Sequence, residues 1–283
     1  MFSLSILLPV TSVAKPIVPQ IDYYAEEKAR QSFDLASSYY QNHLYQDALN
    51  ESVKLIAQYP LTAKVADTLY LIGTIHADTA NPAHDAQLAI QHWEQLLNRF
   101  PKYPQSVEVM MLIAAQWESL NDWHHAILEY DLVSARYPKD QLADDALFWS
   151  ARGEAKLTHY PEAKKKWELI IRQYPTGTDD FYNVKGPFID DSLAMVANVS
   201  LLMHDTTYAI NAWQKIVDQY PDSPYRPFAL FQLGKTYEET YYQPTVAITY
   251  YQKIVDTVTD STWQRLARIK IDQIRKPATN LNP

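Results

Sequence analysis

The stretch AINAWQKIVDQYPDSPYRPFALFQLGKTY, from Ala209 to Tyr237, contains the pattern on which the rest of the chain is built. It starts with an alanine, places a tryptophan four positions later, and closes its first half with Tyr220-Pro221. Apolar residues recur at three- and four-residue steps in both halves, which is the spacing of an amphipathic helix. Proline lacks the N–H that continues a helix and pushes the preceding residue out of the α region. The stretch therefore predicts two helices with a break at Tyr220-Pro221.

The same frame recurs along the chain at roughly 40-residue intervals, which is the signature of a repeat architecture. In five places an alanine stands eleven residues before an aromatic residue that is followed by proline. These places are Ala48 before Tyr59-Pro60, Ala89 before Phe100-Pro101, Ala126 before Tyr137-Pro138, Ala163 before Tyr174-Pro175, and Ala209 before Tyr220-Pro221. A sixth copy starts at Ala247 but ends without the aromatic-proline pair.

We expect an all-α fold, an α-solenoid of about six helical hairpins over residues 25–275. The expected first helices are Ala25–Gln41, Leu61–Asp78, Gln105–Leu120, Gln141–Leu157, Ile189–Met203 and Arg226–Thr240. Their expected partners are Tyr45–Gln58, Asp85–Arg99, Trp123–Arg136, Pro161–Gln173, Thr207–Gln219 and Pro244–Asp256. The polar stretch Ser261–Ile274 is expected to form a C-terminal capping helix, and the segment Thr176–Pro187 a long loop.

Two columns of residues indicate how the helices of each hairpin meet. The first helices carry a small residue at Ala36, Gly73, Ala114, Ala151, Ala197 and Gly234, which lets a neighbouring helix approach closely. The second helices carry an aromatic residue four positions after their alanine, at Trp93, Tyr130, Trp167, Trp213 and Tyr251, with Ser52 as the exception. We expect these aromatic side chains to fill the layer between the two helices.

On these residues the chain resembles the tetratricopeptide repeat, a helical hairpin with a small–small helix crossing and a closing proline. The phrase Tyr220-Pro-Asp-Ser-Pro-Tyr225, followed by Ala229 and Gly234, is also similar to tetratricopeptide scaffolds of the Gram-negative envelope. Two such types are the outer-membrane lipoprotein of the β-barrel assembly machine and the periplasmic coordinator of the Tol–Pal system. The chain lacks the lipid-accepting cysteine of the first type and an obvious N-terminal coiled coil of the second. The resemblance implies a right-handed α-solenoid and a non-enzymatic scaffold that binds another protein.

The ends of the chain give further expectations. Residues 1–14 contain the apolar run Phe2–Leu8 and the small-x-small sequence Ser12-Val13-Ala14, which suits a truncated export signal. We expect residues 15–24 to be an extended lead-in and residues 276–283 a disordered tail. An export signal would place the protein in the periplasm, whereas retention of the segment would favour a cytoplasmic adaptor.

Composition excludes several partner classes. The net charge is −8 without a long basic run, which argues against nucleic acid or an anionic membrane surface as the main partner. There is no cysteine, and hence no disulfide, thiol chemistry or cysteine zinc site. No stretch approaches the ~20 apolar residues of a spanning helix, so we expect no integral membrane span.

The sequence predicts no catalytic, cofactor or metal site and no small-molecule substrate. His124 and His125 are adjacent, so on a helix they point about 100° apart and cannot share one metal ion. Asp179-Asp180 and Asp190-Asp191 lack EF-hand spacing and are better explained as charges near the start of a helix. No nucleophile elbow, P-loop or dinucleotide fingerprint is present.

The candidate binding site is a groove on the first helices, which line the concave side of such arrays. One register carries Phe33, Tyr70, Met111, Phe148, Ala194 and Phe231, and a second, four residues later, carries Ser37, Thr74, Ala115, Arg152, Asn198 and Lys235. The lysine-and-asparagine set of a chaperone-tail clamp is absent. The aromatic register either forms a ridge that binds an apolar peptide or helix, with Arg152 and Lys235 at its flank, or packs between repeats. The leading hypothesis is a partner-binding scaffold of the cell envelope, and the alternative is a helical accessory subunit of a peptidoglycan-processing complex that binds carbohydrate.

Overall fold

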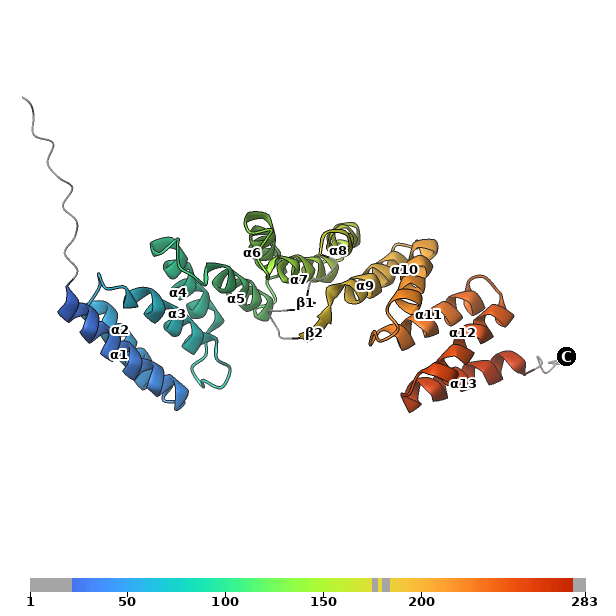
Figure 1. Cartoon of the computed structure of the whole chain (residues 1–283), viewed down its shortest axis with the longest axis horizontal. Helices are drawn as coiled ribbons and strands as arrows, with labels where there is room; N and C mark the ends of the chain where they lie inside the picture. Colours follow the sequence, from blue (N-terminus) through green and yellow to red (C-terminus); the bar gives the residue numbers. More distant parts are fainter. Residues whose placement is uncertain (1–21, 175–177, 180–183, 277–283) are drawn as a thin grey trace, which may run out of the picture. The chain divides into compact units, whose positions relative to one another are not determined.

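In a computed structural model, residues 22–174, 178–179 and 184–276 are described, and this part of the chain folds into thirteen helices (Figure 1). The helices are α1 (Tyr23–Gln41), α2 (Tyr45–Gln58), α3 (Lys64–Ala77), α4 (Ala86–Arg99), α5 (Ser106–Ser119), α6 (Trp123–Arg136), α7 (Ala143–Lys156), α8 (Tyr160–Gln173), α9 (Phe188–Leu202), α10 (Thr206–Gln219), α11 (Arg226–Glu239), α12 (Pro244–Thr257) and α13 (Ser261–Arg275). The all-α helical repeat fold expected from the sequence is confirmed, with every helix in its predicted place to within a few residues.

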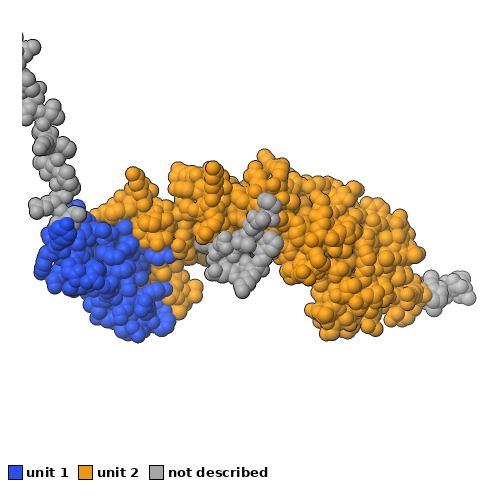
Figure 2. Space-filling model, viewed as in Figure 1, with its two compact units in different colours: residues 1–72 blue, residues 73–283 orange. Residues whose placement is uncertain are grey.

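The chain divides into two compact units, residues 1–72 and 73–283, with the division inside α3 (Figure 2). In the first unit, α1 packs against α2. In the second unit, each helix from α4 to α12 packs against the helix that follows it in the chain. Neighbouring elements in sequence are therefore neighbours in space, as expected of a repeat stack.

The aromatic-proline pairs end the second helix of the first five hairpins, as the sequence predicts. Each aromatic residue is a helix C-cap whose N–H donates to the carbonyl four residues earlier, as Tyr220 does to Ile216 over 3.1 Å. The proline that follows has no N–H with which to continue the ladder. The other C-caps of this kind are Tyr59, Phe100, Tyr137 and Tyr174.

The tight turns inside the hairpins use a left-handed residue that is never glycine. In the fifth hairpin His204 has φ 62°, and the N–H of Asp205 bonds to the carbonyl of Ser200 across the turn. This bond closes a Schellman-type end on α9, while the Asp205 carboxylate caps the start of α10. Residues with the same positive φ at the other turns are His43, Asn121, Thr158 and Tyr242.

The predicted aromatic layer between the two helices of each hairpin is confirmed. Trp93, Tyr130, Trp167, Trp213 and Tyr251 are all buried, as is Ser52 in the first hairpin. The small column faces this layer closely where it contains glycine. A β-carbon placed on Gly73 would lie 2.3 Å from the indole nitrogen of Trp93, and one on Gly234 would lie 2.6 Å from the Tyr251 ring.

Where the layer residue is tyrosine, its hydroxyl extends the contact to the next repeat. Tyr251 donates to Glu238 over 2.9 Å, and Glu238 in turn receives Lys270 of α13 at 3.0 Å. Tyr130 contacts Glu118 in the same way, and Glu118 pairs with Arg152 of the next hairpin at 2.7 Å. The capping helix α13 is thus tied to α11 by the same kind of bridge that ties α7 to α5.

Two details differ from the sequence-based expectations. The lead-in was expected to run to residue 24, but α1 begins at Tyr23 because Asp22 caps it by accepting from the Ala25 N–H over 3.1 Å. The long loop contains a short antiparallel pair, β1 (Thr178–Asp179) with β2 (Val184–Pro187), directly before α9. The expectations for residues 1–14 and for most of the 276–283 tail lie outside the described residues.

The stacked histidines His76 and His92 predict a pH-dependent stability. Their rings are 5.7 Å apart and nearly parallel, and the Nδ1 atom of each is buried without a hydrogen-bond partner among the described residues. Burial lowers the pKa of His76 against the opposing effect of Asp85. Burial and then the proximity of His76 lower the pKa of His92, against a hydrogen bond with Gln95 that raises it. The folded state therefore resists protonation that the unfolded chain accepts near pH 6.5.

We expect the free energy of unfolding to be highest above pH 6.5 and to fall as the pH drops below it. Thermal melts between pH 7.5 and 5 measure this fall. The variant His92→Gln should flatten it, whereas His124→Gln, at an exposed histidine, should leave it unchanged. Equal slopes in all three proteins would show that the stacked pair does not determine the pH dependence.

Candidate partner-binding pocket on α7 to α9

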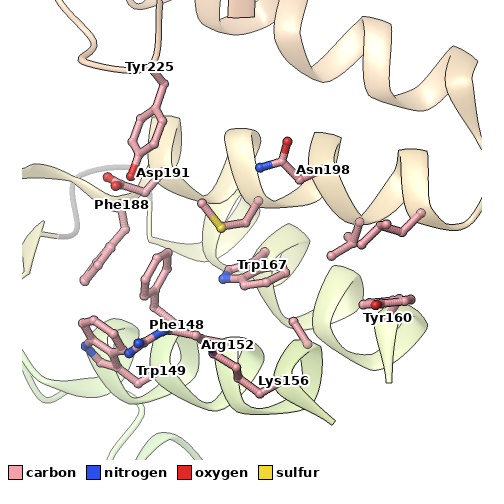
Figure 3. A pocket seen from close by; sticks show the side chains of 14 residues that line it. Phe148, Trp149, Arg152, Lys156, Tyr160, Trp167, Phe188, Asp191, Asn198 and Tyr225 are labelled. Carbon is pink, nitrogen blue, oxygen red and sulfur yellow. The ribbon is translucent and has the colours of Figure 1, made fainter. Parts of the chain in front are cut away.

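A cavity of about 610 Å³ lies among α7, α8, α9 and the residue before α11 (Figure 3). Its volume falls within the range of ligand and peptide side-chain pockets. The lining residues are Phe148, Trp149, Arg152, Ala155, Lys156, Tyr160, Trp167, Phe188, Asp191, Met195, Asn198, Val199, Leu202 and Tyr225.

Aromatic side chains make the wall of the pocket. The Phe148 ring stacks on Phe188 with centroids 4.5 Å apart and meets Trp149 edge-on at 5.5 Å. Trp167, from the inter-helix layer of the fourth hairpin, lies 6.3 Å from Phe148. The helix α9 adds the half-buried Met195 across from them. These rings hold one another in place, so the apolar surface is preformed.

Cations line the side of the pocket formed by α7. Arg152 donates to Glu118 over 2.7 Å, and its guanidinium lies over the Trp149 ring at 4.8 Å. Lys156, one turn later, is exposed, and its Nζ lies 5.9 Å from the centroid of the Trp123 ring. Arg152 and Lys156 are four residues apart, which places them on the same face of the helix.

Polar groups line the side formed by α9. Tyr225 donates its hydroxyl to Asp191, and burial together with this carboxylate raises the pKa of Tyr225, so the hydroxyl keeps its proton. Asn198 is half-buried two turns further along α9. Its side chain makes no hydrogen bond within the described part of the chain, so the amide is available as both donor and acceptor.

Of the two predicted groove registers, the structure brings Phe148, Arg152 and Asn198 into this pocket. A binding ridge requires the side chains of the aromatic register to be exposed. Met111, however, is fully buried, and Ala194 is buried as well. Phe148 is largely buried and presents only part of its ring. The register therefore packs within the repeats at these positions and is no continuous ridge.

The remaining predicted residues have other neighbours. Phe231 is half-buried against Tyr251 and Trp263, with centroids 5.4 and 5.7 Å away. Lys235 is exposed and lies 3.8 Å from Glu239. In the unit of residues 1–72, Phe33 is half-buried under the Lys64 ammonium, 4.8 Å from the ring centroid, and Tyr70 is half-buried.

Sequence reasoning missed Trp149, Phe188, Met195 and Tyr225 as pocket residues. Trp149 comes directly after Phe148 of the aromatic register. Two adjacent aromatic residues were a feature of the sequence from which an aromatic site could have been predicted. Phe188 lies between the expected loop Thr176–Pro187 and the expected helix Ile189–Met203, and its position against Phe148 depends on α9 beginning one residue earlier than expected. Asn198 was noted only as a member of the second register, where it occupies the position that Arg152 has on α7.

Within the described ranges, no group of three or more histidine, aspartate or glutamate side chains is placed to hold a metal ion. None of the helices in the described part of the chain is both long and apolar enough to span a membrane.

Comparison with known proteins agrees with the repeat pattern. Residues 197–223, the end of α9 through the closing Tyr220-Pro221, match the family model described as "Tetratricopeptide repeat". No curated protein sequence matches the chain.

Solved structures with a similar fold are tetratricopeptide-repeat proteins at low sequence identity. The C-terminal part of a repeat-containing protein from Cytophaga hutchinsonii superposes with a TM-score of 0.61 at 12% identity, over 84% of this chain and 86% of that one. A tetratricopeptide repeat protein from Parabacteroides merdae gives 0.53 at 13% identity, over 87% and 86%. The Pseudomonas aeruginosa protein pilF gives 0.51 at 11% identity, over 87% and 99%. At this identity the similarity concerns the fold.

The fold and the matched repeat define the class of protein: an all-α helical repeat protein in which residues 197–223 match a tetratricopeptide repeat and whose fold is similar to that of tetratricopeptide-repeat structures. Such repeats bind other proteins, which is consistent with a protein-interaction scaffold.

Proposed function

We propose that the chain is a non-enzymatic scaffold of the bacterial cell envelope that holds a segment of another protein in the pocket on α7 to α9. The observation that carries the proposal is the pocket itself. It combines a preformed aromatic wall with a few polar groups at its rim, which is the composition of sites that bind apolar anchors with defined orientation.

The pocket suits a polypeptide segment better than a flat protein surface. An anchor side chain inserted between Phe148 and Met195 would be removed from water, and such buried anchors dominate binding energy at interfaces. The free amide of Asn198 matches the N–H and C=O groups that every peptide presents. Asp191 is already satisfied by Tyr225 and helps to position that side of the pocket.

The envelope location rests on the sequence. The chain has no cysteine, and its first fourteen residues have the apolar run and small-x-small sequence of an export signal. If the signal is cleaved, the mature chain begins near Lys15. Intact-mass measurement on protein isolated from its source organism tests this, and recovery of only full-length protein from the cytosolic fraction would contradict the envelope location.

Affinity capture with three matched proteins tests the binding site. The full-length chain, Met195→Glu and Leu128→Glu are immobilised and exposed to an envelope extract of the source organism. Met195→Glu places a charge at the pocket, whereas Leu128→Glu makes the same change at a side chain of α6 that is 64% exposed. We expect Met195→Glu to capture at least tenfold less of the partner than the unmodified chain does, and Leu128→Glu to capture the same amount.

The circular dichroism spectra of the three proteins must coincide. A loss of capture then results from the change in the pocket and not from unfolding. Equal capture by a folded Met195→Glu variant would contradict the proposal. If released glycan strands bind to the pocket and no protein does, the peptidoglycan-accessory alternative is the correct one.

A further inference from the structure

Lys156 is the one cation of the pocket that has no anionic partner within the described residues. Two basic side chains near it in the chain are both paired with carboxylates. Arg152 is paired with Glu118 at 2.7 Å, and Lys166, on α8, reaches Asp131 at 2.9 Å, Glu154 at 3.1 Å and the Ser150 hydroxyl at 2.7 Å. Lys156 has only the face of the Trp123 ring, at 5.9 Å. The α7 rim of the pocket therefore carries one uncompensated positive charge.

The position of this charge relative to the aromatic wall is fixed by α7. Phe148, Arg152 and Lys156 follow one another at i, i+4 and i+8, so they form a line along one face of the helix. The apolar wall lies at one end of the line and the free ammonium at the other, about 12 Å further along the axis at a rise of 1.5 Å per residue. An extended peptide covers that distance in about four residues.

The opposite rim carries one negative charge, on Asp191, and this carboxylate already accepts a hydrogen bond. The Asp191 carboxylate accepts the Tyr225 hydroxyl, and Asn198 is neutral. An incoming basic group would thus meet an uncompensated lysine and a carboxylate that is already hydrogen-bonded, whereas an acidic group would meet a free ammonium. The chain as a whole has a net charge of −8, so this preference comes from the pocket and not from the overall field.

We propose that the pocket selects a peptide segment in which a large apolar side chain is separated by about three or four residues from an aspartate or glutamate that pairs with Lys156. This inference rests on the proposed function, because it assigns the chemistry of the segment that the pocket holds. The apolar anchor supplies most of the affinity, and the carboxylate fixes the direction and register of the segment.

Selection from a displayed library of random dodecapeptides tests the inference on the full-length chain. Peptides that bind the wild type are expected to share a large apolar residue and an acidic residue at this separation. Against Lys156→Glu the same peptides should bind about three- to tenfold more weakly, which is the range for a rim charge pair that is reversed. Selection on this variant should replace the acidic position by lysine or arginine.

Two further variants serve as controls. Lys165→Glu makes the same charge change at an exposed lysine of α8 that does not line the pocket, and it should leave the selected motif and its affinity unchanged. Lys156→Gln removes the charge without reversing it and should abolish the acidic preference while the apolar anchor persists. Weaker binding of the selected peptides at raised ionic strength is expected for the wild type and not for Lys156→Gln.

The outcomes separate this inference from the proposed function. Two results would overturn the role of Lys156 and leave the pocket as a docking site. In the first, the selected peptides lose binding with Met195→Glu but show no preference for an acidic residue. In the second, selection on Lys156→Glu gives the same motif as selection on the wild type. Peptides whose binding is indifferent to Met195→Glu, or no enrichment at all, would overturn both.

Discussion

Trp213→Ala is expected to lower the free energy of unfolding by about 3–5 kcal/mol, as large-to-small changes in a packed core do. Trp213 is fully buried in the aromatic layer of the fifth hairpin, between α9 and α10. Its removal leaves a cavity that the neighbouring helices cannot fill without moving. Chemical denaturation followed by circular dichroism measures the loss.

The location of the effect distinguishes a repeat stack from a single cooperative core. Because each hairpin contacts mainly its neighbours, amide hydrogen exchange in the variant should rise first between Ile189 and Thr240. Trp117→Ala, at a half-buried tryptophan that stacks on the exposed ring of His125, should cost less and raise exchange around α5 and α6. A uniform rise in all hairpins with Trp213→Ala, or none, would show that the layer has been assigned wrongly.

Gly234→Ala is expected to destabilise the chain by about 1–3 kcal/mol, the usual cost of overpacking. The new β-carbon would lie 2.6 Å from the Tyr251 ring, which is itself buried and held by Glu238. The sign of the change in stability is informative, because a glycine-to-alanine substitution inside a helix normally stabilises by nearly 1 kcal/mol.

Gly153→Ala provides the comparison for this variant. Its β-carbon would meet Cγ1 of Ile127 at 2.7 Å, an aliphatic side chain that can change rotamer more easily than a fixed ring can move. We expect a smaller loss than for Gly234→Ala. Thermal melts that show Gly234→Ala to be neutral or stabilising would mean that α11 and α12 are not held at this distance by the glycine.

The helices of this protein could be predicted from the sequence because their ends are determined locally. Tyr220-Pro221 and its counterparts stop a helix through the chemistry of two adjacent residues, and an aspartate such as Asp205 caps the next start. The left-handed residues at the turns were less predictable. His204 and Thr158 occupy a conformation that usually favours glycine, and the surrounding Schellman-type bonds compensate for it.

The pocket could be predicted only in part, because it depends on side chains from several repeats. Met111 and Phe148 occupy the same register, yet Met111 is fully buried whereas Phe148 borders a cavity. The difference arises from the next hairpin, where α9 begins at Phe188 after the β1–β2 insertion and stacks that ring on Phe148. Spacing within one helix does not contain this information.

Site-specific photo-crosslinking in cells of the source organism tests the central claim most directly. A photoreactive amino acid is placed at Met195, inside the pocket, and in a matched strain at Leu128 on the exposed face of α6. The account predicts a discrete protein adduct at Met195 that is absent at Leu128 and is weakened by Lys156→Glu. A folded, expressed protein that gives no protein adduct at Met195, or the same adducts at both positions, would contradict it.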